Sequence, residues 1–295
     1  MTTNPFGRVI TAMVTPMRPD GSLDEVGVRA VVEHLVASGH DGVVVNGTTG
    51  ESATLTDDES IDAVRIVVEA AAGRLAVTAG VGSNSTAHSI EMAERAAQVG
   101  ADALLLVSPY YNKPTQAGLL AHCRAVADST ELPIMLYDIP GRTGVAFSTQ
   151  TLVELAAHPR IVAVKDAKAD LWASTHVMAA TDLLWFSGDD VLTLAHLVQG
   201  AVGCVSVVGH VAGKEYAAML AAVDAGDLAT ARQIHQRLIP VVDAIMTTSQ
   251  GAIMAKAALA ELGVIASSTV RLPLVESPPE DLEILRKGLA EAGLR

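Results

Sequence analysis

Residues 161–166 read Ile-Val-Ala-Val-Lys-Asp, a short apolar run that ends in a lysine. Continuous rather than alternating hydrophobicity is typical of a parallel strand that is buried on both faces. The run therefore predicts an inner strand with Lys165 at its last inward position. An ammonium among apolar side chains is unfavourable, so it must pair with a group such as Asp166, reach water, or lose its proton and become a nucleophile.

Seven further runs of this kind occur along the chain, and their starts lie 20 to 34 residues apart. Each interval can hold the crossover helix that a parallel pair of strands requires. The expected strands are Val9–Thr15, Gly42–Asn46, Ala76–Gly80, Ala103–Ser108, Ile134–Asp138, Ile161–Asp166, Leu184–Gly188 and Cys204–Val208. Eight such units predict a (β/α)8 TIM barrel. An open doubly wound sheet is the alternative, but Gly80-Val81-Gly82 lacks the third glycine of the dinucleotide fingerprint.

Beyond the eighth strand the pattern is helical only. The expected helices are Glu215–Ala225, Leu228–Met246, Ile253–Leu262 and Pro279–Ala292. One helix completes the barrel, so the others predict a catalytic barrel over residues 1–226 and a C-terminal α-helical extension over residues 227–295. Two S/T-x-x-E capping boxes, Ser22–Glu25 and Thr56–Glu59, predict the starts of two barrel helices.

Composition restricts the classes of partner. The 295 residues are 50% hydrophobic and 18% charged, which is enough apolar content for a large core. The net charge is −13 without any Lys/Arg run, so we expect neither nucleic acid nor a membrane surface as a partner. Cys123, Cys204 and the nine histidines show no metal-ligand spacing, and no metal is expected.

One uncharged window, residues 191–213, is long enough to cross a bilayer. Four glycines divide it, and their positions predict a helix, a turn and a buried strand instead. Residues 1–8 contain no apolar run of the kind found in signal peptides, so a cytoplasmic protein is expected.

Catalytic groups of such a barrel lie at the carboxyl ends of the strands. Gly47-Thr48-Thr49-Gly50, the Gly-Thr loop, can hold a carboxylate or be an ordinary turn. Tyr137 can pass protons or simply pack. Arg142 can bind a carboxylate or lie on the surface. Asp189 and Asp190 resemble metal ligands but have no matching His/Glu set, so a capping or supporting role is expected.

Together with Lys165, these groups are the parts of a Schiff-base enzyme for a 2-oxo acid. The amine forms an imine with the ketone, and the Gly-Thr loop holds the carboxylate. The protonated imine then acts as the electron sink for an enamine nucleophile. Because these independent features converge at one barrel face, they favour a functional Lys165 over a structural one.

Five segments resemble, in the same order, the dihydrodipicolinate synthase / N-acetylneuraminate lyase family of class I pyruvate-dependent aldolases. They are Gly47–Glu51, Pro109–Tyr111, Tyr137–Gly144, Val164–Asp166 and Ser187–Asp190. The resemblance covers the whole chain. It implies a TIM barrel with a helical C-terminal part, no cofactor beyond the covalent imine with pyruvate, and a homotetramer built as a dimer of dimers.

The resemblance also implies roles for single residues. Lys165 matches the Schiff-base lysine, and Thr48 and Thr49 match the threonines that bind the pyruvate carboxylate. Thr49 would also share a proton relay with Tyr137. Tyr111 matches the relay tyrosine that a neighbouring subunit donates, so an isolated subunit would be nearly inactive.

Three further positions bear on the substrates. Gly188 and Val205 match positions that lend backbone groups near the substrate. Arg142 matches the residue that binds the carboxylate of a second substrate, aspartate 4-semialdehyde, and it favours the synthase branch in lysine and diaminopimelate biosynthesis. The alternatives are a related aldolase or dehydratase for a sugar acid, such as a sialic-acid lyase, and a non-catalytic paralogue that binds a 2-oxo acid.

Some members of the family bind lysine as an inhibitor at a dimer interface. The matching residues here are Ser52, Ala53, Asn84, His88 and Tyr110. Feedback-sensitive members often carry His, His and Glu where this chain has Asp57, Ser60 and His88. The missing glutamate removes a partner for the lysine ammonium, which predicts weak or absent inhibition.

Overall fold

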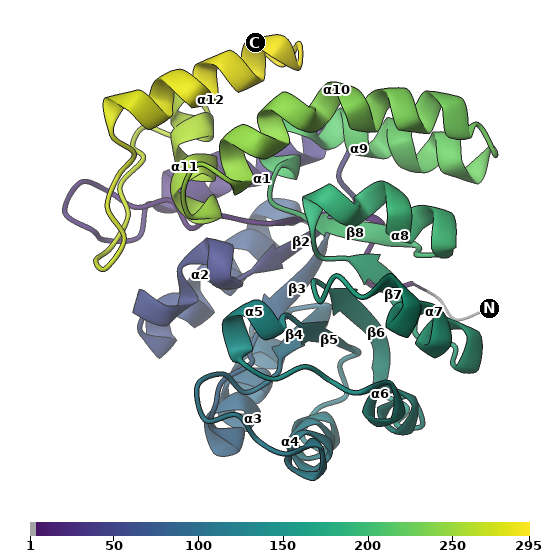
Figure 1. Ribbon diagram of the computed structural model, residues 1–295. Helices are drawn as coiled ribbons and strands as arrows, with labels where there is room; N and C mark the ends of the chain where they lie inside the picture. Colours follow the sequence, from purple (N-terminus) through teal and green to yellow (C-terminus); the bar gives the residue numbers. More distant parts are fainter. Residues whose placement is uncertain (1–3) are drawn as a thin grey trace.

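A computed structural model describes residues 4–295, and its centre is a closed barrel of eight parallel strands (Figure 1). Each strand is hydrogen-bonded to the next one in the chain, and the last is bonded to the first. The strands are β1 (Val9–Ala12), β2 (Gly42–Val45), β3 (Ala76–Gly80), β4 (Ala103–Val107), β5 (Ile134–Asp138), β6 (Ile161–Asp166), β7 (Leu184–Ser187) and β8 (Gly203–Ser206). The TIM-barrel prediction is confirmed, and the open-sheet alternative is wrong.

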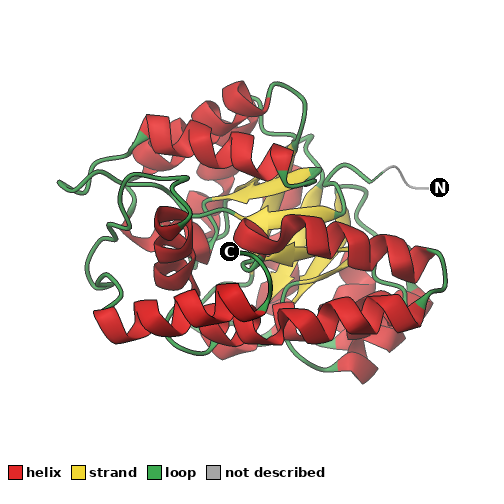
Figure 2. Ribbon diagram, turned by 90° about the horizontal axis from the view of Figure 1, so that it is seen from above, coloured by secondary structure: helices red, strands yellow, loops and turns green. Residues whose placement is uncertain are grey.

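Helices surround the strands, as Figure 2 shows. The α-helices of the barrel are α1 (Glu25–Ala37), α2 (Asp57–Ala71), α3 (Thr86–Gln98), α4 (Gln116–Asp128), α5 (Pro140–Thr143), α6 (Thr149–Leu155), α7 (Leu171–Ala180), α8 (Thr193–Gln199) and α9 (Gly209–Asp224). Short 3-10 helices follow two strands and are η1 (Thr48–Gly50), η2 (Ser52–Thr54) and η3 (Asp190–Leu192). Apart from α9, which follows β8, these helices lie in the connections from one strand to the next.

Only the second of the two predicted capping boxes forms. The Thr56 side chain accepts a hydrogen bond from the backbone N–H of Glu59, whose carboxylate accepts one from the Thr56 N–H at 2.9 Å. Ser22 instead donates its hydroxyl to Asp20 at 2.6 Å, because the chain turns back on itself over residues 18–22. The helix α1 therefore begins without a side-chain cap.

The predicted strand ends agree with the structure to within one residue at six strands, but two strands are shorter than predicted. The first strand ends at Ala12 rather than Thr15, and the eighth at Ser206 rather than Val208. After Ser206 the next two backbone N–H groups donate to the Asp190 carboxylate, at 2.9 and 3.3 Å, instead of to a strand. A buried side chain thus ends the sheet here.

Three helices follow the barrel, namely α10 (Leu228–Met246), α11 (Gly251–Glu261) and α12 (Pro279–Glu291). In Figure 1 α10 lies beside α9 and α12, and the three share a buried core that includes Tyr216, Leu238 and Leu285. The barrel interior holds a separate cluster around Phe186. Helix α9 begins at Gly209, earlier than the predicted Glu215, and contains a break in its backbone.

Within residues 4–295 no single helix is both long and apolar enough to cross a membrane. Helices α10 and α11 reach that length and composition only when taken together, across a bend of 111°. The predicted division of residues 191–213 into helix, turn and strand is confirmed by α8 and β8.

Candidate active site

Lys165 lies near the carboxyl end of β6 with only 5% of its surface exposed. Tyr137 is its register partner on β5, and the Lys165 Nζ atom lies 4.1 Å from the centroid of the Tyr137 ring. In the described part of the chain, no carboxylate lies within ion-pair distance of this ammonium. Asp166 Oδ2 lies 3.4 Å from His196 Nε2 instead, so the interpretation of Lys165 as a partner of Asp166 is wrong.

Burial lowers the pKa of Lys165 to about 7, and the nearby positive charge of Arg142 acts in the same direction. The negative charge of Asp190 opposes this shift. A substantial fraction of the side chain is therefore an uncharged amine at neutral pH, which is the nucleophilic form. The site can form an imine with a ketone without a separate base at this position.

Gly188 makes room for the Lys165 side chain. A Cβ atom at this position would lie 2.7 Å from Lys165 Cγ, closer than real Cβ contacts. The Gly188 N–H donates to the backbone oxygen of Asp166 at 2.7 Å, which fixes the loop against β6. Val205, on β8, is 1% exposed and belongs to the cluster that fills the barrel.

Tyr137 is 5% exposed, and burial raises the pKa of its phenol to about 12, while the charge of Arg142 opposes this shift. The hydroxyl is therefore a proton donor throughout the neutral range. Across residues 4–295, no hydrogen bond connects Tyr137 with Thr49 or Tyr111. The single chain thus brings the tyrosine to the lysine but does not by itself complete the predicted relay.

The Gly-Thr loop forms the short helix η1 rather than an open turn. Thr49 is 6% exposed, whereas Thr48 is exposed to solvent. The backbone oxygen of Gly50 accepts a hydrogen bond from the Thr15 hydroxyl at 2.7 Å, which ties the loop to the chain beyond β1. Two hydroxyls on a fixed turn at the barrel rim are suited to a carboxylate.

Tyr111 is placed differently from the other candidates. Its side chain is 89% exposed, and its φ of 72° is in the left-handed region, which bulky residues rarely adopt. Strained backbone of this kind is common at functional sites. The neighbouring Asn112 donates its side-chain amide to the backbone oxygen of Asn84 at 3.0 Å, which holds this loop against the loop before α3.

Arg142 lies on α5, directly after β5. Its side chain is exposed, and no ion pair engages its guanidinium within residues 4–295. The guanidinium is nevertheless close enough to affect the pKa values of Lys165 and Tyr137. It is therefore available to bind an anion at the mouth of the site.

The supporting role expected for Asp189 and Asp190 is confirmed. Asp189 caps η3 by accepting from the Val191 N–H at 3.1 Å. Asp190 accepts from the hydroxyls of Ser206 and Tyr216 as well as from the chain after β8. Tyr216 was not identified from the sequence, because its place on α9 carries no local signal of a contact with the β7 loop.

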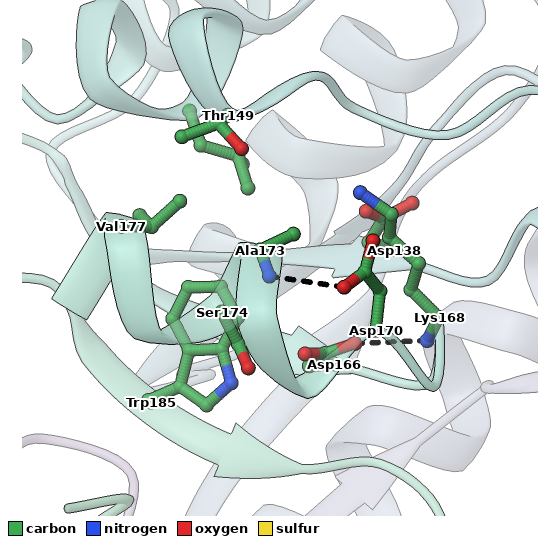
Figure 3. Close-up of a pocket in the computed structure, with 10 residues that line it drawn as sticks. Asp138, Thr149, Asp166, Lys168, Asp170, Ala173, Ser174, Val177 and Trp185 are labelled. Atoms are coloured by element: carbon green, nitrogen blue, oxygen red, sulfur yellow. Dashed lines mark hydrogen bonds between the residues drawn. The ribbon is translucent and has the colours of Figure 1, made fainter. Parts of the chain in front are cut away.

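A second polar cluster lies on the outer side of β5 and β6 (Figure 3). Asp138 and Asp166 are register partners there, and Asp166 accepts from the backbone N–H of Lys168 at 2.8 Å. Burial raises the pKa of Asp138 to about 7. The cavity beside them has a volume of about 10 Å³, which is room for about one water molecule rather than a substrate.

The residues that match the family's inhibitor site lie in two places. Ser52 and Ala53 form part of η2 and are exposed, whereas Asn84 and Tyr110 are joined through Asn112. His88 pairs with Asp57 at 3.0 Å between Nε2 and Oδ1, so its ring is already engaged by a carboxylate of its own chain.

Comparison with known proteins gives a consistent result. A model of the dihydrodipicolinate synthetase family matches residues 5–292. The 4-hydroxy-tetrahydrodipicolinate synthase of Kineococcus radiotolerans is 55% identical over 98% of this chain and 94% of its own length. The 4-hydroxy-tetrahydrodipicolinate synthase 2 of Streptomyces coelicolor is 54% identical, over 99% and 97%. The structure of the synthase from Cyanidioschyzon merolae with lysine bound matches with a TM-score of 0.96, 42% identity and coverage of 99% and 100%.

Proposed function

We propose, because this chain belongs to the dihydrodipicolinate synthetase family, that it is a cytoplasmic 4-hydroxy-tetrahydrodipicolinate synthase. It would condense pyruvate with L-aspartate 4-semialdehyde in lysine and diaminopimelate biosynthesis. The buried, uncompensated amine of Lys165 beside Tyr137 is the observation that carries this proposal. The reaction needs no cofactor beyond the covalent imine.

The first half of the reaction uses pyruvate alone. The Lys165 amine attacks the ketone carbon, water leaves, and a protonated imine forms. Thr48 and Thr49 hold the carboxylate, with backbone groups of Gly188 and Val205 nearby. The methyl group then loses a proton to the water released in imine formation, and the enamine forms because the imine nitrogen accepts the electron pair.

The second half joins the enamine to the aldehyde. The methylene carbon attacks the aldehyde carbon of the semialdehyde, and the resulting alkoxide takes a proton from Tyr137. The amino group of the semialdehyde then displaces the Lys165 amine from the imine carbon, which closes the ring and frees the lysine. Arg142 binds the carboxylate of this second substrate in a bidentate manner. Its exposed position at the barrel mouth supports this role, because the second substrate enters after the imine has formed.

The same proposal includes assembly. Tyr111 is 89% exposed in the single chain, and its place in the relay requires a neighbouring subunit. We propose a homotetramer, and light scattering of the purified protein would give four times the chain mass. A stable, fully active monomer would contradict this assembly.

A turnover assay tests the activity. Purified protein with pyruvate and aspartate 4-semialdehyde, coupled to the next reductase, should consume the reduced nicotinamide. Turnover of N-acetylneuraminate or of a 2-oxo-3-deoxy sugar acid in its place would instead favour the related aldolases.

Arg142→Gln separates the two substrates. We expect the KM for the semialdehyde to rise about tenfold or more, since a charge-assisted bidentate contact is lost. Trapping of the pyruvate imine with borohydride should remain complete, because Arg142 does not form the imine. Unchanged KM for the semialdehyde would remove Arg142 from this role.

We also propose weak or absent feedback by lysine, because His88 stands in place of a glutamate and is paired with Asp57. L-Lysine at micromolar concentration should leave turnover unchanged. Inhibition in that range would contradict this part of the proposal.

A further inference from the structure

A buried ion pair joins the C-terminal extension to the Gly-Thr loop. Lys256 lies on α11 with 0% exposure, and its ammonium pairs with the carboxylate of Glu51, which is 4% exposed. Glu51 directly follows η1 and comes two residues after Thr49 in the chain. Ions removed from water need a partner and further hydrogen bonds, so the pair fixes both side chains strongly.

The backbone at Glu51 is itself unusual. Its φ of 57° and ψ of 34° place it in the left-handed region, where a glutamate is uncommon. Its N–H donates to the Thr48 oxygen at 3.1 Å, which closes the turn that contains Thr49. A displacement of the Glu51 side chain would therefore also move Thr48, the first residue of the proposed carboxylate-binding turn.

The loop between α11 and α12 completes the attachment. The Arg271 backbone N–H donates to Glu51 Oε2 at 2.9 Å, and Lys256 donates to the Thr269 oxygen at 2.7 Å. The Arg271 guanidinium donates to the Thr54 oxygen at 2.7 Å and pairs with Glu59. Both Glu51 oxygens are therefore engaged by the extension, and the chain after Glu51 is held as well.

Charge gives a second reason for this pairing. The Gly-Thr loop is proposed to bind an anion, and an uncompensated carboxylate two residues away would repel it. Lys256 neutralises that carboxylate without approaching the substrate itself. The pair therefore fixes the geometry of the loop and also removes the negative potential that Glu51 would otherwise create there.

We infer that Glu51, Lys256 and Arg271 are positioning residues for pyruvate, so that the C-terminal extension forms part of the pyruvate site. This inference rests on the proposed function, because it takes the Gly-Thr loop as the carboxylate site. None of the three residues touches the reacting atoms. Their loss should weaken pyruvate binding and leave the second substrate unaffected.

The test is borohydride trapping of pyruvate on the full-length protein, followed by mass spectrometry, at a series of pyruvate concentrations. For Lys256→Met we expect the half-saturating pyruvate concentration to rise about tenfold or more, because a displaced binding group loses affinity steeply. The KM for the semialdehyde should change by less than about twofold. The double variant Glu51→Gln/Lys256→Met, which removes both charges, should recover part of the loss.

A matched control lies in the same extension. Arg286 pairs with Glu261 at 2.9 Å between α12 and α11 and has no contact with the Gly-Thr loop. Arg286→Met should leave both substrates unaffected. If Lys256→Met does not fold, Arg271→Met provides the test, since its side chain is 22% exposed and the protein should tolerate its removal. We expect at least about a threefold rise in half-saturating pyruvate relative to Arg286→Met.

Two outcomes would overturn the inference. One is an unchanged half-saturating pyruvate concentration in a folded Lys256→Met or Arg271→Met protein, measured while the unmodified protein is trapped normally. The other is an equal rise of the constants for both substrates, which would indicate general loosening of the fold. Failure of the unmodified protein to be trapped at Lys165 would instead overturn the proposed function, and this inference with it.

Discussion

Within residues 4–295 two lysines are buried, and their surroundings differ in one decisive way. Lys165 is 5% exposed and Lys256 is 0% exposed. Lys256 has a carboxylate partner, Glu51, and a backbone acceptor. Lys165 has the face of the Tyr137 ring and, within residues 4–295, no ion-pair partner.

The difference shows that the burial of a lysine does not by itself determine the role of that lysine. Desolvation lowers the pKa of both lysines, but for Lys256 the hydrogen bond and charge of Glu51 act in the opposite direction. The carboxylate of Glu51 favours the charged form of Lys256, and the pair holds two elements together. An unpaired one gives up its proton near neutral pH and becomes available for chemistry.

The largest expected effect follows from removing the unpaired lysine. Lys165→Met should abolish borohydride trapping of pyruvate and lower turnover by at least about a thousandfold, since the nucleophile is absent. Lys168→Met is the matched control, because Lys168 lies three residues further on and on the outer side of the strands. An adduct that persists in Lys165→Met would place the imine on a different lysine.

Stability should show the opposite order for the two lysines. Lys256→Met leaves the Glu51 carboxylate buried without a cation, so we expect the free energy of unfolding to fall by about 3 kcal/mol. Lys165→Met replaces an uncompensated amine by an apolar side chain, and the change should stay below about 1 kcal/mol. Urea denaturation at one fixed protein concentration measures both. Equal losses would mean that the ion pair has no special stabilising role.

The sequence predicted the features that depend on local pattern. Continuous apolar runs identified all eight strands, and the lysine at the end of one of them pointed to the candidate active site. Helix α10 agrees with its predicted bounds, because its amphipathic pattern is regular and Asp227 caps it. The capping box at Ser22 was wrong because a turn upstream recruits that hydroxyl.

Features that join distant segments were not predictable in this way. Lys256 lies in an apolar helix, as Lys165 lies in an apolar strand. Nothing in the local sequence indicates that Glu51 is the partner of Lys256. The two are brought together only when α11 packs against η1. The contact of Tyr216 with Asp190 was missed for the same reason.

The smallest expected effect concerns the pH profile of the unpaired lysine. Because the pKa of Lys165 is about 7, the initial rate of imine formation at low pyruvate should rise about tenfold per pH unit below 7 and level off above it. The positive charge of Arg142 helps to lower this pKa, so Arg142→Gln should move the midpoint to higher pH. Arg124→Gln, which removes a surface partner of Glu154, should leave the midpoint in place. A midpoint that stays fixed or moves to lower pH in Arg142→Gln would show that the charge of Arg142 does not lower the pKa of Lys165.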